Sequence, residues 1–136
     1  MEIITLEKEH IYELHKEAIS NYGGESATDE NTENKIESIL AQQYSYFGYE
    51  KYPTIIDKAS MLLYFFAKGH CFKDGNKRVA VYSMIAFLNI NGHLTNFSNE
   101  EIENVTYKAA EDKSKGIYID LYIKKISYWL YGKTSD

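Results

Sequence analysis

The segment TIIDKASMLLYFFAKGH, residues 54–70, constrains the fold most because its central part is apolar on almost every face of a helix. A helix that is apolar all round is stable only when other elements cover it. Its longest apolar run, residues 61–67, is far too short to cross a bilayer. We therefore expect a central, buried helix in a soluble and cytoplasmic protein.

Apolar residues recur at helical spacing along most of the remaining chain. Val81, Met84, Ile85 and Leu88 lie at i, i+3, i+4 and i+7 of a second strongly apolar segment, residues 77–93. The sequence therefore predicts an all-α fold, a compact bundle of about six helices. The other four helices are expected at residues 6–21, 33–46 and 98–110 and around Ile119 to Leu130.

Local signals indicate where some of these helices begin. Thr5 is a candidate N-cap of the first helix, and Ser98 with Glu101 has the spacing of a capping box. The single proline, Pro53, ends a tyrosine-rich segment, QQYSYFGYEKYP, whose spacing fits neither helix nor strand. We expect a short extended flap near residues 47–53.

The composition narrows the class of protein. A chain of 136 residues with 44% apolar residues and no repeat or linker is expected to form one domain, residues 1–136. The net charge of -5 disfavours direct binding of nucleic acid. The N-terminus, MEIITLEKEH, lacks the pattern of a signal peptide, and Cys71 has no second cysteine to pair with. We expect no nucleic-acid partner and no membrane partner.

The loop HCFKDGNKR, residues 70–78, joins the two most apolar helices and concentrates groups that bind phosphate. The downstream helix is expected to begin near Asn76 or Lys77, and a helix N-terminus presents unpaired N–H groups to an anion. Gly75 allows the backbone to approach an anion closely. Lys77 and Arg78 add two cations, of which the guanidinium can hold phosphate with two parallel bonds.

Two further residues of this loop suggest catalysis. His70 can accept a proton from a hydroxyl near neutral pH, and Asp74 can hold Mg²⁺. A base, a metal ligand and an anion cradle are the components needed for transfer of a phosphate-containing group. Taken singly, these residues also fit a helix cap, a turn and a solvated pair of cations. The residues alone leave a catalytic loop and a polar turn as open alternatives.

The spacing of this loop resembles the H-x-F-x-(D/E/N)-(A/G)-N-(G/K)-(R/K) motif of the Fic/Doc superfamily. The segments YGG before it and AFLNINGH after it resemble the death-on-curing (Doc) branch, and the resemblance extends from Ile11 to about Gly92. The superfamily fold is all-helical. The resemblance implies that His70 is the general base, that Phe72 anchors the loop to the core, and that Asp74 positions Mg²⁺ on ATP. It further implies phosphate-binding or anion-hole roles for Gly75, Asn76, Lys77 and Arg78.

Two positions distinguish the reactions of this superfamily. Fic enzymes that transfer AMP usually carry glycine in place of Lys77 and a second arginine in place of Val81. Doc-type toxins share the lysine, and in them the γ-phosphate of ATP meets the target hydroxyl. The resemblance implies a kinase toxin that phosphorylates a threonine of elongation factor Tu, with a Phd-like antitoxin whose disordered tail folds on binding. An adenylyltransferase and a non-catalytic anion- or peptide-binding module are the alternatives.

Three other features carry competing interpretations. SATDEN fits the (S/T)-x-x-x-E-(G/N) pattern of Fic inhibitory helices, which would make Glu30 inhibitory, but an ordinary loop and helix cap is favoured. The tyrosines of residues 44–52 fall where the family guides its target, although packing onto the bundle is favoured. Cys71 stands where many relatives have proline, and we expect a half-buried structural thiol.

Overall fold

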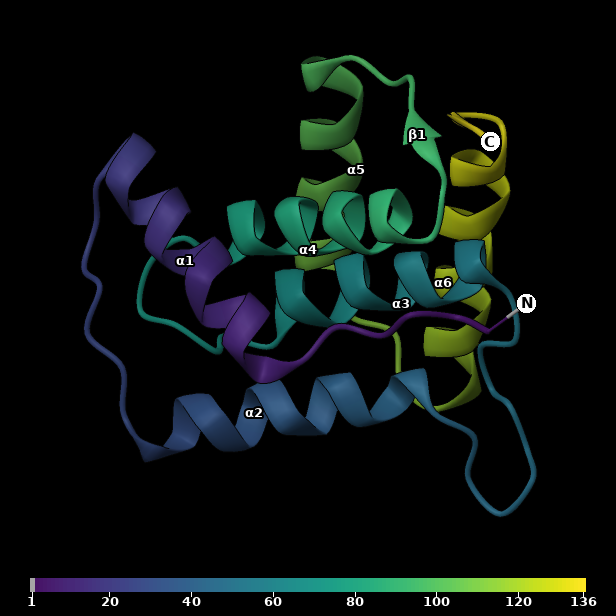
Figure 1. Ribbon diagram of the computed structural model, residues 1–136, viewed down its shortest axis with the longest axis horizontal. Helices are drawn as coiled ribbons and strands as arrows, with labels where there is room; N and C mark the ends of the chain where they lie inside the picture. The colour runs from purple at the N-terminus through teal and green to yellow at the C-terminus, as the bar shows by residue number, and fades with distance from the viewer. Residues whose placement is uncertain (1) are drawn as a thin grey trace.

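The computed structural model describes residues 2–136 and contains six α-helices, one 3-10 helix and a two-stranded antiparallel sheet (Figure 1). This arrangement confirms the predicted all-α bundle. The helices are α1 Lys8–Tyr22, α2 Glu30–Leu40, η1 Ala41–Gln43, α3 Ile55–Lys68, α4 Asn76–Ile90, α5 Asn99–Glu111 and α6 Ile117–Tyr131. The strands are β1 Leu94–Thr95 and β2 Thr134–Ser135, with Leu94 opposite Ser135. No helix within residues 2–136 is long and apolar enough to cross a membrane.

Helix α3 lies at the centre of the bundle, as its composition predicts. Met61, Leu62 and Leu63 lie on successive faces and are all fully buried. The helix packs most extensively against α4 and is also covered by α5 and α6 (Figure 1). These contacts belong to one core that extends from Leu6 to Leu130. The expected single domain over residues 1–136 stays a prediction.

The neighbouring helices α3 and α4 are joined by a short connection, residues 69–75. This connection lies at the end of the bundle where α1 finishes and α2 begins (Figure 1). The loop singled out in the sequence is therefore held by a rigid helical pair and bordered by two other helices.

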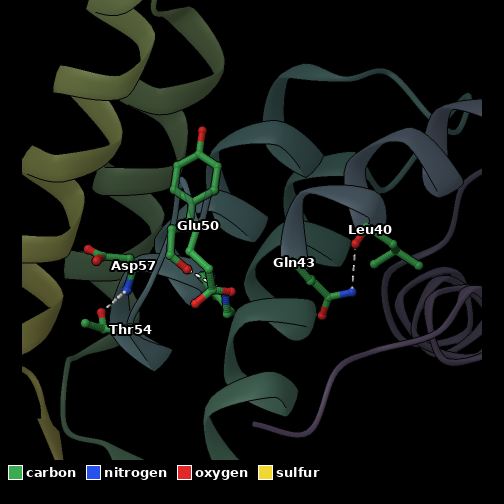
Figure 2. Close-up of polar contacts among 7 residues, drawn as sticks. Leu40, Gln43, Glu50, Thr54 and Asp57 are labelled. Carbon is green, nitrogen blue, oxygen red and sulfur yellow. Dashed lines mark hydrogen bonds and ion pairs between the residues drawn. The ribbon is translucent and has the colours of Figure 1, made fainter. Parts of the chain in front are cut away.

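The predicted start of a helix is correct where the capping side chain binds the first turn of its own helix. Thr54 caps α3 by accepting from Asp57 N at 3.0 Å (Figure 2), and Ser98 forms the expected capping box with Glu101. The predicted cap at Thr5 is wrong. Glu7 is the N-cap of α1, and the Thr5 hydroxyl instead hydrogen bonds to the Tyr44 hydroxyl at 3.0 Å.

The second helix begins and ends earlier than predicted. Asp29 caps it by accepting from Asn31 N and Thr32 N, so the helix begins at Glu30. Its end is fixed by Gln43, whose buried Nε2 donates to Leu40 O at 3.1 Å (Figure 2). This contact favours a tighter 3-10 turn after Leu40.

The segment expected to form an extended flap is non-helical and contains a tight hairpin turn. Tyr46 and Tyr49 exchange backbone hydrogen bonds of 2.9 and 3.0 Å around a two-residue turn, in which Phe47 and Gly48 both have positive φ. The hairpin leads into the N-terminal end of α3, whereas His70 follows the C-terminal end of this helix. The 14 residues of α3 span about 21 Å. The tyrosine-rich hairpin thus lies at the opposite end of the bundle from the loop (Figure 1), and the family-based expectation about the tyrosines is wrong in this respect.

The favoured alternative, packing of the tyrosines onto the bundle, is correct for Tyr52. This side chain is buried, and its hydroxyl donates to Asp120 Oδ1 at 3.4 Å. Tyr46 and Tyr49 are exposed on the hairpin instead. The buried Lys58 ammonium holds the hairpin to α3 through Glu50 Oε1, at 3.2 Å, and the Tyr52 carbonyl.

Candidate active site

His70 opens the loop between α3 and α4 with its side chain exposed. Its φ of 48° lies in the left-handed region, where an L-residue other than glycine costs roughly 1–2 kcal/mol. Lys35 Nζ donates to the His70 carbonyl at 3.0 Å and so ties this sharp bend to α2. The strained backbone is held in place while the imidazole stays accessible to a substrate.

A single side chain closes the loop behind His70. Asn76 Oδ1 accepts from Phe72 N at 3.0 Å, and Asn76 Nδ2 donates to Phe72 O at 2.8 Å. Both polar ends of this amide are bound within the loop, which leaves the backbone N–H of Asn76 as its group available to an anion. The Asn76 side chain thus fixes the loop conformation, and its expected part in shaping an anion hole stays a prediction.

Phe72 joins the loop to the core. It is 4% exposed, stacks on the His15 ring with centroids 3.7 Å apart, and contacts Tyr12 edge-on. This position agrees with the anchoring role that the resemblance implies.

His15 is a supporting residue that the sequence reasoning did not identify. It is buried on α1, and its Nε2 lies 2.9 Å from Asp74 O. The contact joins residues 59 positions apart, so no local motif indicates it. The available signal is that His15 falls between Ile11 and Ala18 on the apolar face of α1.

The side chain of Asp74 is held by the segment that follows α1. Its Oδ2 accepts from Glu25 N at 2.7 Å, and the neighbouring Lys73 pairs with Glu25 Oε2 at 3.0 Å. Gly24 permits this approach, because a Cβ added there would lie 3.0 Å from the Cβ of Asp74. Within residues 2–136 the structure gives Asp74 Oδ1 no hydrogen-bond donor, so this oxygen is available to a cation.

No group of three or more potential metal ligands from His, Cys, Asp and Glu occurs within residues 2–136. Mg²⁺ does not require such a group when phosphate is present, because it binds through one or two carboxylates together with phosphate oxygens and waters. The exposed Asp74 carboxylate, with one oxygen already oriented by Glu25, fits that mode of binding.

The first turn of α4 has the backbone features of an anion-binding helix terminus. Gly75 is the N-cap with φ 85° and ψ 10°, a left-handed conformation that favours glycine. No side chain among the described residues caps this end, and the first backbone bond of the helix runs from Val79 N to Gly75 O. The preceding N–H groups and the positive end of the helix dipole are therefore available to an anion.

Two cations lie on this turn. Lys77 and Arg78 are both exposed, and the Arg78 guanidinium lies 3.6 Å from the centroid of the Tyr22 ring. A cation–π contact of this kind orients the guanidinium without neutralising its charge. Tyr22, the last residue of α1, thus positions one of the expected phosphate-binding side chains.

A cavity borders the loop on each side. The cavity on the His70 side has a volume of about 440 Å³ and lies against the start of α2, with Lys35 in its wall. The cavity on the other side has a volume of about 960 Å³, begins at Lys77 and Arg78, and continues between α4 and α5. His70 and the two cations therefore border different cavities.

Comparison with known proteins agrees with the resemblance. The sequence model of the Fic/DOC family matches residues 5–88, more than half of the chain. The chain belongs to the Fic/DOC family. It is 31% identical over 102 residues to the protein kinase doc of Escherichia phage P1, covering 75% of this chain and 79% of that protein. It is 40% identical over 55 residues to the toxin Doc of Mycolicibacterium smegmatis, covering 40% of this chain and 42% of that protein.

The location of Glu30 in this Fic/DOC protein agrees with the favoured alternative. Glu30 is the exposed first residue of α2, and its neighbour Asp29 supplies the helix cap. The SATDEN segment thus has the geometry of a loop and N-cap. An inhibitory role of Glu30 stays a prediction.

Cys71 of this Fic/DOC protein is a core residue. It is 3% exposed, more buried than expected, and burial raises the pKa of its thiol to about 11. A thiol with this pKa stays protonated near neutral pH and is a poor nucleophile. The structural interpretation of Cys71 is correct.

Proposed function

We propose that this Fic/DOC protein is a toxin that transfers the γ-phosphate of ATP to a hydroxyl of a target protein. The observation that supports this most is the arrangement of one loop. An accessible imidazole, His70, stands at its start, and a helix terminus without a side-chain cap among the described residues, followed by Lys77, stands at its end. An anion-binding module alone would have no need of the base.

In the proposed reaction His70 accepts the proton of the target hydroxyl while its oxygen attacks the γ-phosphorus. The bond between the γ-phosphorus and the bridging oxygen breaks, and ADP leaves. The first-turn N–H groups of α4 and the Lys77 ammonium stabilise the negative charge of the transferred group. Mg²⁺, held by Asp74 and phosphate oxygens, would neutralise part of the charge on the nucleotide.

Lys77 favours phosphate transfer over AMP transfer in this proposal. Its exposed ammonium on the first turn of α4 adds charge and bulk where AMP-transferring relatives have glycine. The aliphatic Val81 supplies no second arginine one turn later. Both features support the kinase interpretation, and AMP transfer is the outcome that would contradict it.

The target and the partner are part of the same proposal. We infer that the target is a threonine of a translation factor such as elongation factor Tu, so that transfer arrests translation in the cytoplasm. A cognate antitoxin, Phd-like with a disordered tail, would restrain the toxin. The support is the resemblance together with the names of two relatives, a protein kinase and a toxin.

The test uses ATP labelled at the γ-phosphate and, separately, at the α-phosphate. Each sample is incubated with Mg²⁺, a bacterial lysate and the protein, beside a His70→Ala variant and the matched control His93→Ala at the far end of α4. We expect one protein to be labelled from the γ-position by wild type and His93→Ala, but not by His70→Ala. Label from the α-position would mean AMP transfer, and no His70-dependent label would contradict both reactions.

A further inference from the structure

We infer that the cavity between α4 and α5 binds the nucleoside of the nucleotide, an inference that rests on the proposed phosphotransfer. Its volume of about 960 Å³ lies within the usual range of small-ligand sites. One wall begins at Lys77 and Arg78, the residues expected to hold phosphate. A nucleotide whose phosphates lie on the first turn of α4 would therefore extend into this space.

The direction of transfer selects this cavity over the one beside His70. The γ-phosphate must meet the target hydroxyl next to His70, so the rest of the nucleotide points away from the imidazole. The smaller cavity has His70 in its wall and is left for the segment that carries the hydroxyl. The larger cavity lies on the side of Arg78 and can take the nucleoside without competing with the target.

Aromatic rings occur at the right places to bind a base. Tyr82 follows Arg78 by four residues on α4, which places it on the same face about 6 Å further along the helix axis. Tyr107 lines the cavity from α5 and is 57% exposed. An accessible ring in a nucleotide-sized cavity offers a stacking surface for a base.

The charges of the two walls favour one orientation of the nucleotide. The α4 wall carries the cations Lys77 and Arg78, whereas the α5 wall carries the exposed carboxylates Glu100 and Glu103. Phosphates are attracted to the first wall and repelled by the second. Ribose hydroxyls and base amino groups can donate hydrogen bonds to carboxylates, so the neutral nucleoside suits the α5 wall.

Binding measured by calorimetry tests the inference without any enzymatic turnover. The probes are the non-hydrolysable ATP analogue AMP-PNP and inorganic tripolyphosphate, each with Mg²⁺. We expect Tyr107→Ala to weaken binding of AMP-PNP by at least about fivefold, because a base–aromatic stack contributes roughly 1–3 kcal/mol. Binding of tripolyphosphate should not change, because it has no nucleoside. Tyr107→Phe keeps the ring and should retain affinity.

A matched control and a second variant make the outcome decisive. Tyr128→Ala removes an exposed tyrosine from α6, outside the cavity, and should affect neither probe. If wild type binds AMP-PNP but Tyr107→Ala and Tyr82→Ala bind it equally well, the nucleoside lies elsewhere and this inference is wrong, while the phosphotransfer proposal stands. If Tyr107→Ala weakens both probes alike, the cavity does not recognise a nucleoside. If wild type binds neither probe, the proposed function fails as well.

Discussion

The substitution Asn76→Ala separates the loop geometry from the stability of the bundle. Asn76 makes two hydrogen bonds to the backbone of Phe72, of 3.0 and 2.8 Å, and these close the loop behind His70. Each such bond contributes roughly 0.5–1.5 kcal/mol net, so the loss of both should lower the free energy of unfolding by roughly 1–3 kcal/mol. Because the released groups belong to the loop, phosphate transfer should fall far more than this change in stability requires.

The chain contains a matched control at the other end of the same helix. Asn91 also binds backbone with its amide: Nδ2 donates to Phe87 O and Ile4 O at 2.9 Å, and Oδ1 accepts from Ile4 N at 2.8 Å. Asn91→Ala removes three such bonds and should cost at least as much free energy of unfolding, but leave transfer intact at temperatures where the variant is folded.

Two measurements are compared for wild type and both variants. Urea unfolding gives the change in stability, and His70-dependent transfer of γ-label gives the activity. The expected result is a loss of stability in Asn91→Ala at least as large as in Asn76→Ala, and a loss of activity in Asn76→Ala alone. Equal activity losses in the two variants, or full activity in Asn76→Ala, would refute the reasoning that this amide holds the loop in its working geometry.

Three further predictions follow from the same region. Gly24→Ala should destabilise the protein more than Gly23→Ala in urea unfolding, because both glycines have positive φ but an added Cβ at Gly24 alone approaches Asp74. Lys77→Gly should lower transfer of γ-label and introduce transfer of α-label, measured with the two labelled forms of ATP. Burial raises the pKa of the Cys71 thiol to about 11, so the folded state retains its proton where the unfolded thiol, with its ordinary value of 9.0, loses it. The difference in unfolding free energy between wild type and Cys71→Ala should thus decrease as pH rises from 9.0 to about 11.

The fold could be predicted wherever the information is local. An apolar surface on every side of residues 59–67 requires a central helix, and a serine followed by glutamate three residues later specifies the start of α5. The predicted start of α1 was wrong because a residue distant in the sequence determines where this helix begins. Gln43 Oε1 accepts from Leu6 N at 2.9 Å, and Gln43 Nε2 donates to Leu6 O at 3.0 Å. With the backbone of Leu6 bound in this way, the helix begins two residues later, at Lys8, whatever cap Thr5 could offer.

The same distinction holds for the candidate site. The loop motif indicated a candidate base, the glycine turn and the two cations because these residues are close together in the sequence. It did not identify the groups that hold them, since His15 and Glu25 reach Asp74 across 59 and 49 residues. Nor could the spacing reveal that the amide of Asn76 is bound internally. A local pattern specifies which chemistry is present, whereas its geometry depends on contacts that only the folded chain creates.

Helix α1 supplies most of those contacts from one face. Tyr12, His15 and Tyr22 lie at i, i+3 and i+10, so they project from the same side of the helix toward the loop. Tyr12 and His15 pack on Phe72, and Tyr22 orients the Arg78 guanidinium. The docking of α1 against α4 therefore fixes both the anchored middle of the loop and its cationic end. It follows that the nine-residue motif, placed between two other helices without such a face beside it, would keep its chemical groups and lose their arrangement.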